Sequence, residues 1–87
     1  MIETGGIVKS MAGRDAGRFF VVIRMEKDVA YLADGEVHPL EKPKKKRLRH
    51  LQKTNQTAQA EEMMTNHILR RTLSRLNSRR DNGVLVT

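Results

Sequence analysis

The lysine and arginine side chains of this sequence are concentrated in one short segment, residues 42–53. The segment holds seven of them and no acidic side chain. Residues 1–41 carry five basic and seven acidic side chains, and residues 54–87 carry five and three, so the segment accounts for the formal net charge of +7. Positive charge at this density is stabilised most by an anion, and nucleic acid is the commonest dense polyanion that a small protein meets. A solvated linker or a localisation signal has a similar composition and is the alternative interpretation.

A second candidate for anion binding is the loop expected over residues 11–17, which contains two glycines. Gly13 and Gly17 allow backbone N–H groups to approach a phosphate closely, and basic side chains around them can bind it. The side chains at this loop that can donate hydrogen bonds to a phosphate are Lys9, Ser10, Arg14 and Arg18. We expect Asp15 to pair with one of the arginines and to hold the loop in shape. The alternative is that the glycines only turn the chain.

The composition argues against catalysis and against a metal or cofactor site. The chain has no cysteine, so disulfides and thiolate metal sites are impossible, and its three histidines lack metal-ligand spacing. No nucleophile–base or paired-carboxylate motif is present, and 87 residues leave little room for a pocket. We therefore expect a protein that is not an enzyme and that has no cofactor and no small-molecule substrate.

The sequence does not indicate a membrane protein. No apolar run approaches the roughly 20 residues that a membrane-spanning helix needs. The first residues lack the basic-then-apolar layout of a signal peptide. The expectation is a cytoplasmic protein that forms one small domain. Two phenylalanines and one tyrosine are too few for a base-stacking platform, which favours recognition of nucleic-acid backbone and shape.

The first half of the chain predicts four short strands joined by tight turns. Val, Ile and Phe form apolar runs there, and glycine and aspartate separate these runs. The expected strands cover residues 6–10, 18–24, 29–33 and 36–40. The Asp34-Gly35 pair predicts a hairpin turn between the last two strands, because both residue types tolerate positive φ. Four such strands in about 40 residues indicate a small, curled antiparallel barrel.

Residues 56–80 predict a helix, because Ala, Glu, Met, Leu and Arg are frequent there and neither Pro nor Gly interrupts them. A short strand over residues 84–86 is expected after it, with a frayed end as the alternative. The predicted second strand is apolar on both of its faces, so one face needs a cover from the helix or from another protein. We expect one face to line the barrel through Phe19, Val21 and Ile23. We expect the helix to cover the other face through contacts of Leu69, Leu73 and Leu76 with Phe20 and Val22.

Residues 5–23 resemble a KOW motif, which has a short strand, a loop with one glycine at a fixed place, and an apolar strand. Gly17 matches that glycine. With residues 29–35 and the Lys-Pro-Lys run from Lys42, the chain is similar to the KOW-domain RNA-binding proteins of the eukaryotic- and archaeal-type large-subunit ribosomal protein family fourteen-e. The resemblance implies an SH3-like β-barrel that binds RNA, often ribosomal RNA, partly through the first loop. Some KOW domains instead bind transcription factors or other proteins. Residues 54–87 match no family pattern.

The chain is therefore expected to be mainly β. A small SH3-like KOW barrel is predicted over residues 1–41, a basic segment that completes or flanks it over residues 42–55, and a C-terminal helix with a short tail over residues 56–87. We expect it to bind ribosomal or other structured RNA without catalysis. The alternative is a protein-interaction module that contacts ribosomal, translation or transcription proteins through the helix. The predicted nucleic-acid-binding residues are Lys9, Ser10, Gly13, Arg14, Gly17, Arg18, Lys42, Lys44, Lys45, Lys46, Arg47, Arg49, His50 and Lys53.

Overall fold

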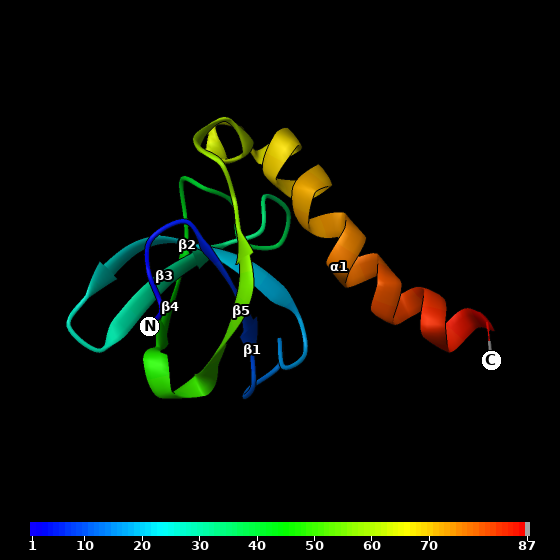
Figure 1. Ribbon diagram of the computed structural model, residues 1–87, viewed down its shortest axis with the longest axis horizontal. Coiled ribbons are helices and arrows are strands. Elements are labelled where there is room, and N and C mark those ends of the chain that lie inside the picture. The colour runs from blue at the N-terminus through cyan, green and yellow to red at the C-terminus, as the bar shows by residue number, and fades with distance from the viewer. Residues whose placement is uncertain (87) are drawn as a thin grey trace.

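Figure 1 shows a strongly curved sheet with one long helix beside it. The computed structural model describes the backbone of residues 1–86 and the side chains of residues 1–77. The strands are β1 (Gly6–Ser10), β2 (Phe19–Glu26), β3 (Val29–Ala33), β4 (Lys44–Arg47) and β5 (Leu51–Thr57). The 3-10 turn η1 (Leu48–His50) joins the last two strands, and a second 3-10 turn, η2 (Ala60–Met63), precedes the helix α1 (Asn66–Val86).

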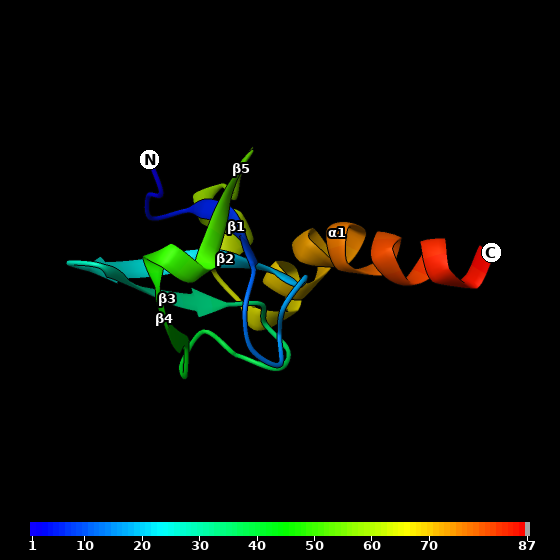
Figure 2. The same ribbon diagram turned by 90° about the horizontal axis from the view of Figure 1, so that it is seen from below.

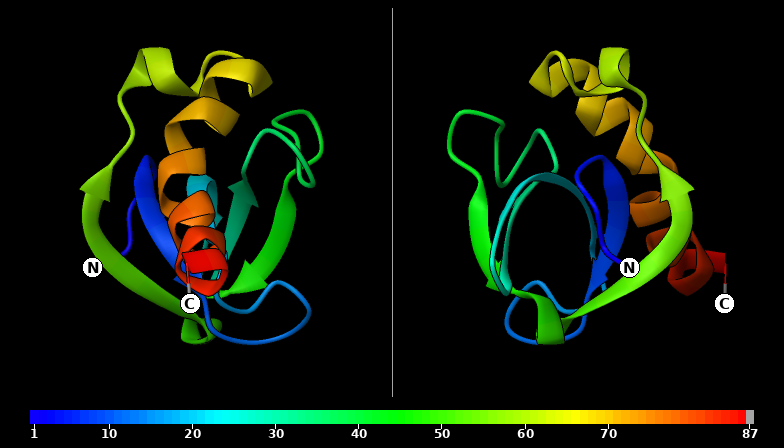
Figure 3. Two further views of the ribbon diagram at one scale, coloured as in Figure 1. Left: turned by 90° about the vertical axis from the view of Figure 1, so that its right-hand side faces the viewer. Right: turned by 60° about the vertical axis from the view of Figure 1, so that its left-hand side comes forward.

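All neighbouring strands pair antiparallel, in the order β4-β3-β2-β1-β5. The outer strands β4 and β5 follow each other in the sequence, but within the described residues no strand pairing joins them, so the sheet is open. Figure 3 shows the strands curving so that η1 connects the two outer ones at one end of the sheet. The predictions of a mainly β fold and a C-terminal helix are therefore confirmed, whereas the pairing does not establish a closed barrel.

The fourth strand does not lie at residues 36–40, where it was predicted. That prediction is wrong because the Asp34 carboxylate folds this segment into a loop. Its Oδ1 atom accepts hydrogen bonds from the backbone N–H groups of Glu36 and His38, both at 2.9 Å. These groups are then unavailable to a strand ladder. The fourth strand is instead built from the basic run, in which Lys44–Arg47 pair with β3.

The helix begins at Asn66 and not at residue 56. Of the residues that were assigned to its start, Gln56 and Thr57 end β5, which pairs with β1, and Ala60–Met63 form η2. The Thr54 hydroxyl also donates a hydrogen bond to the Ile7 carbonyl oxygen at 2.6 Å. Pairing with β1 satisfies the backbone groups of this segment, and that gain outweighs a weak local preference for helix. At the other end, residues 84–86 belong to α1, so the strand predicted there is also wrong.

The apolar residues form two clusters, one on each face of β2. The first face packs Phe20 and Val22 with apolar residues of the curved sheet, namely Val8, Ala30, Leu32 and Leu51. The second face packs Val21 with Ile7, Ala33, Leu69 and Leu73, and with the half-buried Phe19, Ile23 and Leu76. The leucines of α1 do dock on the sheet, as expected. They dock on the face opposite to the predicted one.

Small residues at the end of β3 explain which face receives the helix. Ala33 is fully buried under α1, and Gly35, two residues later, has φ at +78°. A Cβ atom on Gly35 would collide with the Asn66 carbonyl oxygen and lie 2.9 Å from the Arg70 backbone nitrogen. The helix backbone therefore packs directly on the β3–β4 loop, which a larger side chain at this position would prevent.

Two asparagines fix α1 at both ends of this contact. Asn66 accepts a hydrogen bond from the Leu40 N–H at 2.7 Å and donates one to Glu41 Oε1 at 2.8 Å. The buried Asn77 accepts a hydrogen bond from the Phe19 N–H at 2.9 Å and donates one to the Phe19 carbonyl oxygen at 3.4 Å. Figures 1 and 2 agree that α1 continues past the sheet after this contact.

Candidate nucleic-acid interface

The basic run folds as one outer edge of the sheet and the turn that follows it. It forms β4, η1 and the beginning of β5. Most of its charged side chains are exposed, and these are Lys42, Lys44, Lys45, Arg47, Arg49 and Lys53. The His50 side chain is half-buried. The run is thus a folded, cationic edge of the domain, and not a free linker.

The first loop lies directly against this edge. The Met11 N–H donates to the His50 carbonyl oxygen at 2.8 Å, and Lys46 Nζ donates to the Ala12 carbonyl oxygen at 2.6 Å. The loop is closed at its base by hydrogen bonds between Ser10 and Arg18 at 2.9 Å and between Gly17 and Ser10 at 2.7 Å. The structure therefore brings together the two segments that were selected separately as anion-binding candidates.

A small buried polar cluster holds the loop to β4. Asp15 Oδ1 lies 2.8 Å from Lys46 Nζ and accepts a hydrogen bond from the Ser10 hydroxyl at 2.8 Å. The Lys46 and Asp15 side chains are only 9% and 11% exposed. Asp15 therefore pairs with Lys46, and not with Arg14 or Arg18 as expected. Ser10 and Lys46, both predicted to bind nucleic acid, have hydrogen-bond partners inside the protein and position the loop.

The electrostatics of this cluster favour the ionised form of Asp15. Burial raises the pKa of the carboxyl, but the hydrogen bonds from Lys46 and Ser10 lower it, as do the positive charges of Lys46 and Lys44. The result is a pKa below the usual value for aspartate. Lys44 and Lys46 are two residues apart in β4, so their side chains leave the same face of the strand, the face on which Lys46 contacts the loop.

The glycines of the loop are needed for its backbone path. Gly13 and Gly17 have φ at +84° and +91°, a region that other residues rarely adopt. A Cβ atom on Gly13 would also lie 3.3 Å from Lys46 Nζ. Their conformation is thus explained by the turn and by the approach of Lys46. Arg14, between them, is exposed.

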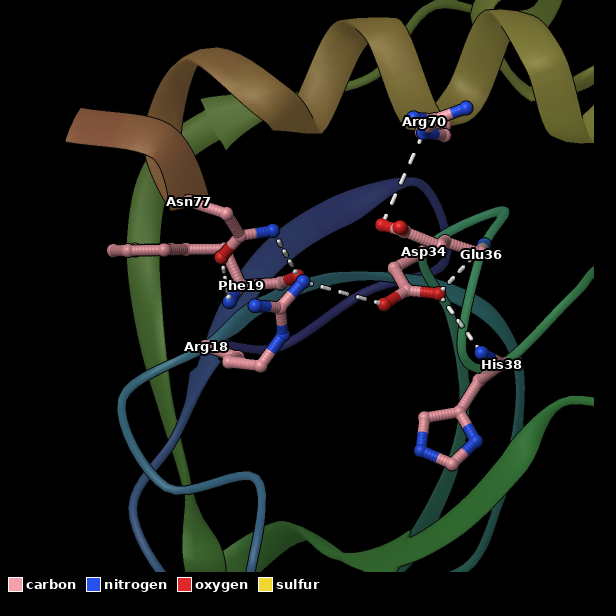
Figure 4. Close-up of polar contacts among 7 residues, drawn as sticks. All are labelled: Arg18, Phe19, Asp34, Glu36, His38, Arg70 and Asn77. Atoms are coloured by element: carbon pink, nitrogen blue, oxygen red, sulfur yellow. Dashed lines mark hydrogen bonds and ion pairs between the residues drawn. The ribbon is translucent and has the colours of Figure 1, made fainter. Parts of the chain in front are cut away.

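The remaining loop residues, Lys9 and Arg18, lie toward α1. Lys9 Nζ lies 5.9 Å from the centre of the Phe19 ring, a cation–π contact. Arg18 points toward Asp34, with 3.8 Å between Nη2 and Oδ2, as Figure 4 shows. Arg18 therefore connects the first loop to the polar groups beneath the helix.

On the outer face of β2, β3 and β4, the predicted residue Lys45 lies in a row with Arg24 and Tyr31, which were not selected from the sequence. The Arg24 guanidinium lies 4.1 Å from the centre of the Tyr31 ring, and Lys45 is paired with Tyr31 across β3 and β4. The Tyr31 hydroxyl donates a hydrogen bond to Glu26 at 3.0 Å. The signal that could have found this row is the strand alternation of residues 29–33, which puts Tyr31 on the opposite face from Ala30 and Leu32.

Comparison with known proteins adds no identification. No protein-family model matches this chain, and no curated protein matches it. Over the part of the chain that the structure describes, none of the helices combines the length and the apolar character needed to cross a bilayer.

Proposed function

We propose that this chain is a non-catalytic RNA-binding protein whose interface is formed by the basic edge and the first loop. The observation that carries the proposal is their convergence: Lys46 reaches Asp15 and the Ala12 carbonyl, and Met11 bonds to His50. Charges from two distant segments then share one surface, where they can bind several phosphates at once.

The charges proposed to bind phosphate are those that face solvent. In the basic run these are Lys42, Lys44, Lys45, Arg47, Arg49 and Lys53, with Arg14 from the loop. Arg47 lies 3.6 Å from Asp28, but both side chains are exposed. Such a surface pair contributes little to stability, so Arg47 remains available to an anion. Ser10 and Lys46 are proposed to hold the loop in place and to make no direct contact with RNA.

We also propose that the sheet curls into an SH3-like barrel related to the KOW domains. Support comes from the two outer strands, which are joined by the three-residue turn η1, and from the curvature in Figure 3. The strand–loop–strand arrangement of β1 and β2, with Gly17 at positive φ, agrees with the resemblance to a KOW motif. Structured RNA, including ribosomal RNA, is the ligand that this resemblance implies.

A salt titration with matched variants tests the interface. The triple variant Lys44→Ala, Lys45→Ala and Arg49→Ala removes three charges from the basic edge. The control variant Lys27→Ala, Arg71→Ala and Arg75→Ala removes three exposed charges outside the basic run and the first loop and has the same net charge. Each lost phosphate contact reduces the slope of log affinity against log salt by about 0.7–0.9. We expect the first variant to flatten the slope by about 2–3 and the control to change it little. Equal effects would mean general attraction to polyanions.

The preference for RNA is tested by comparing a folded RNA hairpin with the matching DNA hairpin at physiological salt. Net charge attracts both polymers, whereas A-form groove shape and 2′-hydroxyl contacts are specific to RNA. We expect tighter binding to the RNA hairpin. Equal affinities with equal salt slopes would contradict the RNA-specific part of the proposal.

A second candidate function, as a protein-interaction module, rests on α1. Met64, just before the helix, and Ile68, within it, are 72% and 37% exposed. Figure 1 shows that α1 also extends beyond the sheet. Purified protein that binds no RNA but forms a stable complex with a translation or transcription protein would favour this function.

A further inference from the structure

A polar cavity of about 290 Å³ lies between the β3–β4 loop, the end of the first loop and α1. Its polar lining consists of Arg18, Asp34, Glu36, Arg70, Ser74 and Asn77. Figure 4 shows most of these side chains, with Arg18 and Asp34 facing each other below the helix. The volume is near the lower end of the range of about 300–1,000 Å³ that is typical of small-molecule sites.

Asp34 is the most unusual group in this cavity, because it is a carboxylate with only 2% of its surface exposed. Its Oδ1 atom is fully used by the backbone N–H groups of Glu36 and His38. Within the described part of the chain, its Oδ2 atom has no hydrogen-bond partner, and neither has the buried Nε atom of Arg18. The nearest approach between the two side chains, Nη2 to Oδ2, is 3.8 Å, which is too long for a hydrogen bond.

Buried polar atoms without partners are rare and costly, so this acceptor and this donor, on two facing side chains, call for an explanation. A ligand that presents a donor next to an acceptor would satisfy both atoms. The charges around them limit what that ligand can be. Two arginines and two acidic residues line the cavity, and the second pair, Arg70 and Glu36, is also 3.9 Å apart. A phosphate would be repelled by the carboxylates and a cation by the guanidinium groups, whereas a neutral polar group is opposed by neither.

We propose that this cavity receives one unpaired nucleobase of an RNA strand whose phosphates lie on the basic edge. An N–H group of the base donates to Asp34 Oδ2, and a neighbouring oxygen or ring nitrogen accepts from Arg18 Nε. Proteins bind unpaired RNA bases in this way, by hydrogen bonds to their edges and by stacking on arginine planes. Arg18 directly follows the first loop and lines the cavity, so the cavity borders one of the two segments of the proposed interface. The inference rests on the proposed function and specifies a ligand group for it.

Free nucleosides test the cavity separately from the basic edge, because they carry a base and no phosphate. We would titrate the full chain with cytidine, adenosine, guanosine and uridine and follow its signals by NMR. At least one nucleoside is expected to shift the backbone amide signals of Glu36 and His38 and the Arg18 Nε–H signal in a saturable way. The amide signals of Lys45 and Arg49 should stay in place. No saturable shift for any nucleoside would overturn the inference.

Asp34→Asn is the decisive variant. It keeps a carbonyl oxygen for the Glu36 and His38 N–H groups and replaces the free acceptor by a donor. We expect nucleoside affinity to fall at least about tenfold, and Arg71→Gln, outside the cavity, to leave it unchanged. Unchanged affinity in Asp34→Asn would mean that the nucleoside does not bind through Asp34 and would overturn the inference. Should Asp34→Asn not fold, Arg18→Lys keeps the charge, removes Nε and should give the same loss.

Different experimental results would contradict the base site in the cavity and the RNA interface on the basic edge. If nucleosides do not bind while the basic-edge variant still flattens the salt slope, the base site is wrong and RNA binding stands. If nucleosides bind through Asp34 while RNA hairpins bind neither wild type nor variant, the cavity recognises a base and the basic edge is not an RNA interface.

Discussion

Lys46 and Asp15 are 31 residues apart in the sequence, and their Nζ and Oδ1 atoms lie 2.8 Å apart in a largely buried contact. The pair connects the middle of β4 to the tip of the first loop. It also divides the basic run by role, since one lysine holds the structure together while its neighbours face solvent.

This pair predicts that Lys46 is a stability residue. Lys46→Met removes the ammonium group and leaves the buried Asp15 with the Ser10 hydroxyl alone. We expect the free energy of unfolding, measured by urea denaturation, to fall by about 1–3 kcal/mol. Lys45→Met is the matched control on the same strand, and its exposed side chain should change stability by less than about 0.5 kcal/mol. Equal stabilities of the two variants would contradict the role assigned to Lys46.

The lowered pKa of Asp15 predicts a loss of stability in acid. The folded protein binds a proton to Asp15 less readily than the unfolded chain, so the contribution of Asp15 is fully present above the unfolded pKa of about 3.9. It is lost as the pH falls through the lower folded pKa. The difference in unfolding free energy between wild type and Asp15→Asn should therefore shrink below about pH 4. A difference that stays constant from neutral pH to pH 2.5 would contradict this.

The docking of α1 predicts a large effect of Leu73→Ala. Leu73 is fully buried between the helix and the Val21 face of β2. Its truncation should lower the free energy of unfolding by about 2–5 kcal/mol, through lost burial and the cavity that remains. Ile68→Ala, at a partly exposed position of the same helix, serves as the control and should cost much less. The melting temperatures of both variants, compared with that of the wild type, test this docking of α1.

The close approach of α1 to the β3–β4 loop predicts that Gly35 is irreplaceable. Gly35 and Gly5 both have positive φ, +78° and +87°, so alanine at either position carries a similar backbone cost of about 1–2 kcal/mol. A Cβ on Gly5 would meet only the Ala58 carbonyl oxygen at an ordinary 3.7 Å, whereas one on Gly35 would collide with the helix backbone. Gly35→Ala should therefore destabilise the protein more than Gly5→Ala. Equal losses in chemical denaturation would show that the helix is not packed this closely.

Local patterns predicted the strands of the first half well. Residues 6–10 and 29–33 match β1 and β3, because each combines β-forming residues with glycine or aspartate at its ends. The same patterns misplaced β4. A Lys-Lys-Lys-Arg segment has no apolar alternation, and it becomes a strand only because β3 offers it an unpaired edge.

The sequence was sufficient to predict the two segments of the candidate site separately. It did not predict that the two segments lie against each other. Charge density identified the basic run, and paired glycines identified the loop. Lys46 has the same side chain as Lys44 and Lys45, so only the folded register shows that it alone reaches Asp15. The pairing of Arg18 with Asp34 was likewise hidden, because it depends on how the β3–β4 loop folds beneath α1.

The outer position of β4 has a consequence for how copies of the protein meet. An outer strand exposes unpaired N–H and C=O groups on which a strand of another chain can add, and lysines on such a strand oppose this by mutual repulsion. β4 is made of three lysines and one arginine, so its protection against aggregation is its charge. RNA bound along β4 would neutralise that charge. The ligand that the basic edge attracts would thereby also lower the barrier to contact between neighbouring copies.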